Sequence, residues 1–161
     1  MRLPGPKHVK DVFEGLLGRE VVVTDCTPVL LDSRLRPSTA AYVDDARRLS
    51  TVVLMDFALT AWVGAALALL PRGGVEDALE EGQLPSSLLE NVAEVYNVLA
   101  GVISRTGDLH QRLHEAYGPG VPAPSDVTAW AAVPTSRVNL RLDIKGYGGG
   151  TLSMISALPS G

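Results

Sequence analysis

The chain has 161 residues, of which 46% are apolar and 20% charged, and its formal net charge is −4. This balance is typical of one domain with an ordinary core, and it argues against nucleic-acid binding, which needs a basic stripe. Because Cys26 has no second cysteine to pair with and the longest apolar stretch, residues 57–70, is too short for a membrane span, we expect a single cytoplasmic domain over residues 1–161 with no membrane partner.

The first half of the chain predicts two helices with three strands between them, after a flexible lead at residues 1–6. The expected elements are a helix over 7–17, strands over 19–24, 39–43 and 49–55, a hairpin loop at 44–48, and a helix from 57 or 58 to 70. The strand at 49–55 is apolar throughout, which predicts burial on both faces. Asp56 precedes the second helix and is expected to cap it, and the Pro71 to Gly74 segment is expected to end it.

The second half predicts a long helix followed by strands. The expected elements are an acidic helix or loop at 75–84, the longest helix from Pro85-Ser86 to His114 or beyond with a break near Gly107, a breaker segment at 118–124, and strands at 128–133, 137–145 and 151–157. Ser86 or Ser87 is expected to cap the long helix. Residues 146–150 are glycine-rich and predict a turn that joins the last two strands as a hairpin.

This order predicts an α+β fold, in which an antiparallel or mixed sheet is packed with long helices. The pattern of a helix followed by strands occurs twice, which suggests a degenerate duplication.

The long helix has two distinct faces when residues 88–104 are projected at about 100° per residue. One face is apolar and is expected to lie against the core: Leu88, Val92, Val95, Leu99, Val102 and Ile103. The opposite face carries Glu90, Glu94, Asn97, Gly101 and Ser104. Glu94 and Asn97 therefore stand one turn apart and point the same way. The small residues Ala93, Ala100 and Gly101 lower the surface around them, so that a partner could come close.

The run from Glu94 to Gly101, EVYNVLAG, resembles the E-x-x-N helix of the CheC/CheX/FliY chemotaxis phosphatases, including the Ala-Gly that follows in CheX-like members. The layout of most of the chain is similar as well, although the motif covers only eight residues. Three features depart from the family pattern. Glu90 stands where Ser or Asp is common, a following proline could be Pro119, Pro122 or Pro124, and residues 44–48 replace a glycine-rich hairpin.

The resemblance implies a CheX-like, single-site phosphatase that dephosphorylates the aspartyl phosphate of a CheY-like response regulator. Asn97 would position the attacking water and Glu94 would dock the partner, with Glu90, Ala93, Gly101 and Ser104 as further contacts. The Mg²⁺ would belong to the regulator, so that the chain would need no cofactor or metal of its own, and it would be a monomer or a homodimer. Two alternatives are a CheX-like binding module in two-component signalling without catalysis, and an α+β domain with an unrelated role.

Two other patterns favour structural interpretations. His110 and His114 are spaced like two metal ligands on a helix, but no third ligand is evident, which favours a surface or packing role. The glycines at 146–150 lack the Lys-Ser/Thr and the strand–helix context of a phosphate-binding loop, which favours a hairpin turn.

Overall fold

The computed structural model of the chain describes residues 1–29, 36–132 and 136–156. Its elements are α1 (Pro6–Leu17), β1 (Val21–Asp25), β2 (Ser38–Asp44), β3 (Leu49–Met55), α2 (Phe57–Leu67), α3 (Arg72–Glu81), α4 (Ser86–Gly107), β4 (Gln111–Tyr117), α5 (Ser125–Ala131), β5 (Arg137–Ile144) and β6 (Gly149–Ser156). The α+β fold expected from the sequence is confirmed.

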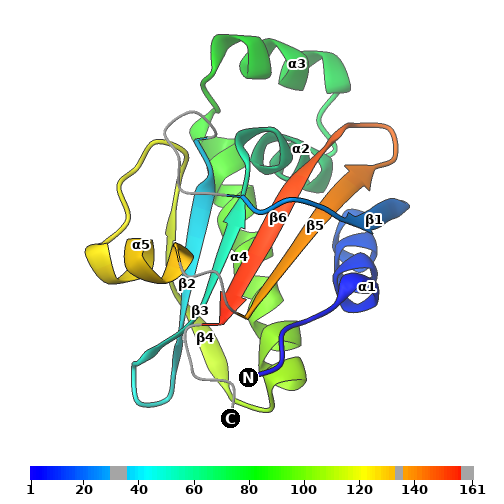
Figure 1. The fold of residues 1–161 in the computed structure, drawn as a ribbon. Coiled ribbons are helices and arrows are strands. Elements are labelled where there is room, and N and C mark those ends of the chain that lie inside the picture. Colours follow the sequence, from blue (N-terminus) through cyan, green and yellow to red (C-terminus); the bar gives the residue numbers. More distant parts are fainter. Residues whose placement is uncertain (30–35, 133–135, 157–161) are drawn as a thin grey trace.

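The strands form a six-stranded sheet in the order β1-β5-β6-β3-β2-β4, and every pairing is antiparallel. Side chains alternate between its two faces. One face packs with α1, α2 and α4 in the larger core cluster, and the other packs with α5 in a smaller cluster around Val52, Leu54 and Ile155. Figure 1 shows α4 passing behind the sheet and α5 on the near side, beside β2.

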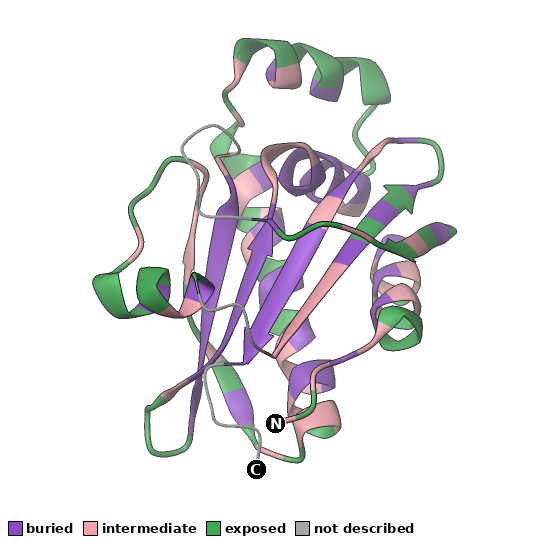
Figure 2. Cartoon of the chain, in the orientation of Figure 1, coloured by how far each residue is buried: buried purple, intermediate pink, exposed green. Residues whose placement is uncertain are grey.

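The strands β2 and β3 and the helix α2 form the most buried part of the molecule. β3 is buried at every position except Leu49, which confirms the expectation from its apolar run. Figure 2 shows α2 and the middle of the sheet in the buried colour. Asp56 caps α2 as expected, because the Leu59 backbone N–H donates to Asp56 Oδ1 at 2.8 Å, and the second carboxylate oxygen accepts from Thr151 N at 3.0 Å.

The two halves of the chain repeat the same arrangement. If β1 is exchanged with β4, β2 with β5 and β3 with β6, the strand order becomes β4-β2-β3-β6-β5-β1, which is the original order read from the other edge of the sheet. The two hairpin turns match at positions one hundred residues apart: Asp44 N bonds Arg48 O and Ile144 N bonds Gly148 O, both at 3.0 Å. The topology therefore supports the internal duplication that the sequence suggested.

The structure corrects the sequence prediction around α4. The helix ends at Gly107, and residues 111–117 form β4, so His110 and His114 do not share a helix. The capping prediction for Ser86 or Ser87 is wrong as well: Pro85 is the N-cap, and no side chain bonds the first N–H groups.

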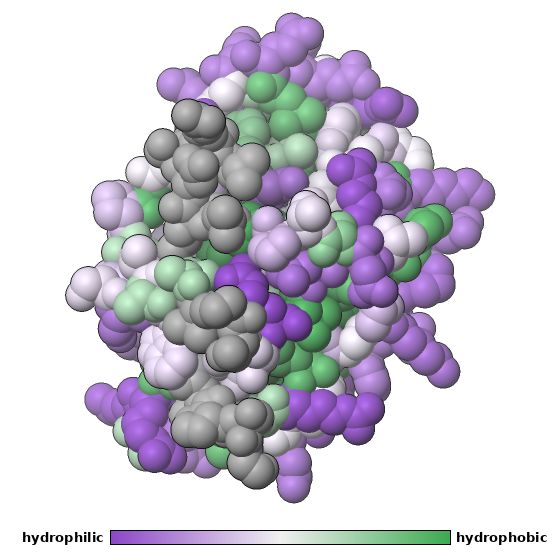
Figure 3. Space-filling view, viewed as in Figure 1, coloured by the Kyte–Doolittle hydropathy of each residue, from purple (hydrophilic) through white to green (hydrophobic). Residues whose placement is uncertain are grey.

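Three further boundaries differ from the predictions. Residues 125–131 form the helix α5 where a strand at 128–133 was expected; residue 133 lies outside the described residues. α2 ends at Leu67, not Leu70, and Leu69 adopts a positive φ of 57° just beyond it. The segment expected to stop α2 instead begins α3, which buries Val75 and Ala78 and turns its acidic side to solvent. Figure 3 shows hydrophilic side chains covering this end of the molecule.

The N-terminal residues expected to form a flexible lead lie against the end of α4. Pro4 is buried, Leu3 packs against the core, and Gln111 Nε2 donates to Met1 Sδ at 3.1 Å. At the other end, the last predicted strand is β6, and residue 157 lies outside the described residues.

Candidate functional site on helix α4

The long helix α4 presents the two faces that its sequence predicts. Its buried residues are Leu88, Val92, Val95, Tyr96, Leu99, Val102 and Ile103, which are the predicted apolar stripe with Tyr96 added. Glu90, Glu94 and Asn97 are exposed on the opposite side. The helix runs without interruption over 22 residues, so these three side chains share one rigid scaffold.

A close contact with α2 fixes the position of the first half of α4. Gly64 of α2 faces Leu88, and a Cβ at residue 64 would come within 2.8 Å of the Leu88 carbonyl oxygen. Asn91 Nδ2 donates to the Gly64 carbonyl at 3.1 Å across the same contact. The absence of a side chain at Gly64 therefore lets the two helix backbones approach, and the amide of Asn91 locks their register.

Two buried tyrosines fix the middle of α4 to β2. Tyr96 shares a hydrogen bond with Ser38 Oγ at 2.7 Å and donates to Ser38 O at 3.2 Å. Tyr42 in turn donates its hydroxyl hydrogen to the backbone carbonyl of Tyr96. Because Tyr96 immediately precedes Asn97, these bonds hold the backbone that carries the candidate site.

We expect these tyrosines to make the fold sensitive to alkali. Burial raises the pKa of both Tyr42 and Tyr96 above the ordinary value of 10.0. Above pH 10 the unfolded chain releases protons that the folded chain retains, so the free energy of unfolding falls by up to about 1.4 kcal/mol per pH unit for each tyrosine. Urea unfolding between about pH 9 and pH 11.5 should show this slope, and Tyr96→Phe should remove one of the two contributions. An unchanged slope in that variant would contradict the prediction.

Glu94 and Asn97 are exposed and form no polar contact through their side chains in the described residues. Neither side chain forms a hydrogen bond or an ion pair with any residue in the described part of the chain. The same holds for Glu90, which lies one turn before Glu94. A carboxylate pair and an amide therefore project to solvent along one line of the helix.

The C-terminal part of the exposed face of α4, around Gly101, differs from the sequence prediction. Gly101 and Ala93, which lie about two turns apart on α4, are both half-buried. However, Arg105 Nη1 lies 3.2 Å from the place of a Cβ at Gly101, so a guanidinium covers part of the surface where the sequence predicted only small residues. The spacing of four residues between Gly101 and Arg105 could have revealed this neighbour.

Ser104 has a structural partner inside the chain. Its hydroxyl donates to Gln111 O at 3.0 Å and accepts from Gln111 N at 2.9 Å, which ties the end of α4 to the start of β4. In the other half, Glu14 Oε2 accepts from Val21 N at 3.0 Å in the equivalent place, ninety positions earlier. With the same offset of ninety residues, Glu94 corresponds to Pro4 and Asn97 corresponds to Lys7. The first half of the chain therefore has no carboxylate and amide at the equivalent positions.

A shallow cavity of about 230 Å³ adjoins the N-terminal part of the candidate face. It is lined by Arg36, Phe57, Gln83, Leu84, Leu89 and Pro119. Arg36 lies over the Phe57 ring, with 4.9 Å between its guanidinium carbon and the ring centroid. Of the three prolines considered from the sequence, Pro119 is the one that lines this cavity beside α4.

The described residues contain no group of three or more His, Cys, Asp or Glu that could hold a metal ion. His110 Nδ1 instead bonds Asp45 Oδ1 at 2.6 Å, at the surface. None of the helices in the described ranges combines the length and the apolar character that crossing a membrane requires.

Comparison with known proteins identifies the fold. No family model matches the sequence, and no curated protein shows significant similarity to it. Solved structures do match: the FliM middle domain from H. pylori has a TM-score of 0.60 at 7% identity and covers 94% of this chain and 84% of its own. FliY from Thermotoga maritima has a TM-score of 0.56 at 17% identity, with 93% of this chain and 83% of that chain covered.

A third match is the CheX–CheY–BeF3–Mg²⁺ complex from Borrelia burgdorferi, with a TM-score of 0.51 at 12% identity and 93% of both chains covered. The chain has the CheC/CheX/FliY fold. In this CheX-like fold the candidate residues Glu90, Glu94 and Asn97 occupy the exposed face of the long helix α4. At these identities the comparison concerns architecture, so the chemistry must be argued from the side chains themselves.

Proposed function

We propose that the chain binds a phosphorylated CheY-like response regulator through the exposed face of α4 and hydrolyses its aspartyl phosphate. The observation that carries the proposal is the pair Glu94 and Asn97, exposed one turn apart and unbonded within the described residues on a helix fixed from behind. The CheX-like fold supports it, because one of its relatives in structure is a complex with CheY.

Asn97 suits the task of placing water. An acyl phosphate is already activated, so its hydrolysis requires a water molecule held in line with the breaking P–O bond and neutralisation of charge. The carboxamide offers an acceptor and a donor at fixed spacing, so that it can orient a water molecule without itself reacting. The regulator would supply the phosphorylated aspartate and the Mg²⁺, and this chain would supply only the positioned amide.

Glu94 suits the task of docking. A carboxylate one turn before Asn97 can pair with a lysine of the regulator and thereby fix the rotation of the two proteins. Glu90 extends the negative charge by one more turn toward the Leu89–Pro119 cavity, where an apolar side chain of the partner could be buried. Ala93 keeps the surface beside Glu94 and Asn97 low, so that the partner's active-site rim can approach, whereas Arg105 lies over Gly101 at the far end of the face.

The direct test uses CheY-like regulators from the source organism, phosphorylated with acetyl phosphate and then freed of the donor. Loss of phosphate is followed on phosphate-affinity gels with and without a tenth of an equivalent of this chain. We expect a cognate regulator to lose its phosphate at least about tenfold faster, with turnover. Failure of every regulator to respond, with no binding either, would overturn the proposal.

The alternative is a binding module without catalysis. Glu90 favours it, because a long acidic side chain stands where the resembling family commonly has Ser or Asp, and it could crowd the phosphoryl group. Stable binding of the BeF3-activated regulator without any change in its dephosphorylation rate would select this alternative. Glu90→Ser would then be the variant with which to seek recovery of activity.

A further inference from the structure

A separate pocket lies on the opposite face of the sheet from α4. It is lined by Ala41, Val43, Arg47, Leu49, Arg112, His114, Tyr117, Pro124, Asp126 and Val127, and its volume is about 200 Å³. Ala41 belongs to the core cluster on the α5 side, whereas the next residue, Tyr42, reaches α4. A partner on α4 would therefore leave this pocket open.

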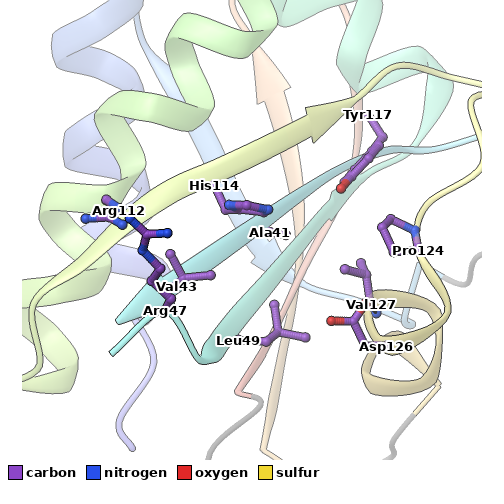
Figure 4. A pocket seen from close by; sticks show the side chains of 10 residues that line it. All are labelled: Ala41, Val43, Arg47, Leu49, Arg112, His114, Tyr117, Pro124, Asp126 and Val127. Carbon is purple, nitrogen blue, oxygen red and sulfur yellow. Dashed lines mark hydrogen bonds between the residues drawn. The ribbon is translucent and has the colours of Figure 1, made fainter. Parts of the chain in front are cut away.

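A β-bulge in β4 brings two of the pocket's polar side chains to the same face of the sheet. Ala41 pairs with Glu115 and Tyr42 pairs with Leu113, so His114 is an extra residue in the edge strand. The bulge changes the alternation of side chains, so that His114 and Tyr117, three residues apart, line the same pocket. Figure 4 shows His114 between Arg112 at one end and Tyr117 at the other.

The β2–β3 turn supplies Arg47 in an unusual backbone conformation. Arg47 has a φ of 63°, in the left-handed region that non-glycine residues rarely adopt. The turn is held by Asp44, whose Oδ1 accepts from Ala46 N and Arg48 N, both at 2.9 Å. These bonds hold the backbone in a conformation that directs Arg47 toward the same end of the pocket as Arg112 (Figure 4).

Neither arginine at the basic end of the pocket is paired with an acidic side chain of the described residues. Within the described ranges, neither Arg47 nor Arg112 forms an ion pair or a hydrogen bond through its side chain. Asp126 is the acidic residue of the lining, and in Figure 4 it lies beside Val127, away from the two arginines. Between the two ends, Val43 and Leu49 form an apolar floor.

We propose that this pocket binds a small phosphate monoester with an apolar or aromatic body. Two guanidinium groups match a phosphate dianion in charge and in the number of donors. The body would lie over Val43 and Leu49 beside the Tyr117 ring, and Asp126 would accept a hydrogen bond from a hydroxyl or amino group at the far end. A volume of about 200 Å³ is below the usual range of pockets for drug-sized ligands, which favours a small monoester over an extended peptide.

The test is a titration of the whole chain with phenyl phosphate, followed by calorimetry and by the methyl NMR signals of Val43, Leu49 and Val127. We expect saturable binding that shifts these methyl signals, with weaker binding of inorganic phosphate and of benzoate. Arg112→Ala and Arg47→Gly should each raise the dissociation constant about tenfold. Glycine accepts the φ of residue 47, so this variant should keep or raise its melting temperature.

Matched variants separate the headgroup from the body. Leu49→Ala should weaken phenyl phosphate binding and leave inorganic phosphate unchanged, whereas Lys145→Ala removes an equal charge away from the pocket and should change neither. Absence of saturable binding at 10 mM, equal affinity after loss of either arginine, or tighter binding of benzoate would overturn the proposal. So would tighter binding of an acidic decapeptide, which would mark the site as a protein interface.

Discussion

Replacing Asn97 with alanine should reduce the accelerated dephosphorylation of the regulator by at least about a hundredfold, while the affinity for the regulator changes less than threefold. The reason is that the amide acts on the attacking water, which matters only as the P–O bond breaks, and not on the docked ground state. The fold should be unaffected, because Asn97 is exposed and alanine favours a helix interior. Single-turnover decay of the phosphorylated regulator and calorimetric binding of its BeF3 form separate the two effects.

Three companion variants make this prediction specific. Asn97→Asp keeps the shape and the acceptor but loses the donor and adds a negative charge, so its rate should fall as far as that of the alanine variant. Glu94→Ala should instead raise the half-saturating regulator concentration about tenfold, because it removes a docking charge. Lys145→Ala, at an exposed position of the turn between β5 and β6, should change neither quantity. Full activity of Asn97→Ala would show that Asn97 has no catalytic role, whatever the chain binds.

Patterns that depend on neighbours in the sequence could be predicted. The apolar stripe of α4 recurs at helical spacing, so the exposed positions of Glu94 and Asn97 followed from projection alone. The strand at Leu49–Met55 was predicted to the residue because its apolar run is long and lies between a polar turn and a capping aspartate. In each case the local preference and the tertiary environment agree.

Structure that depends on the edge of the sheet could not be predicted from the sequence. β4 carries Gln111, Arg112 and His114, and its bulge interrupts the alternation, so the segment reads as the polar end of the preceding helix. α5 contains the β-branched residues Val127 and Thr128, which favour a strand, although Val127 and Ala131 have the four-residue spacing of the helix that forms. In α3 the paired glycines lie in the first turn, where they cost less than in a helix interior.

The support behind the candidate site was also beyond prediction from one sequence. Tyr96 looks like an ordinary helix residue, and its role comes from Ser38 and Tyr42, which are more than fifty residues away in the chain. Arg105 could have been found from its spacing of four residues from Gly101, but the closeness of its guanidinium to Gly101 is seen only in the structure. The sequence therefore identified the exposed polar groups of α4, and the structure identified the residues that hold the helix behind them.

Replacing Gly64 with valine should lower the free energy of unfolding by about 3 kcal/mol, the upper part of the range for an overpacked core. A Cβ at this position would come within 2.8 Å of the Leu88 carbonyl and 3.2 Å of Val92 Cγ2, and the backbone contact cannot be relieved by a side-chain rotation. The two helices must move apart, which also breaks the bond from Asn91 to the Gly64 carbonyl. Urea unfolding followed by tryptophan fluorescence measures the change.

Gly15→Ala is the matched control, since Gly15 is a helical glycine with no atom within 4 Å of its Cβ position. This variant should be more stable than the parent by about 0.5 to 1 kcal/mol, because alanine loses less backbone entropy on folding. A valine at position 64 that is tolerated as well as an alanine at position 15 would contradict the close packing of α2 and α4. Since α4 carries Glu94 and Asn97, the Gly64 variant should also lower the dephosphorylation rate at temperatures where it remains folded, through a displacement of the helix and not through any contact with the regulator.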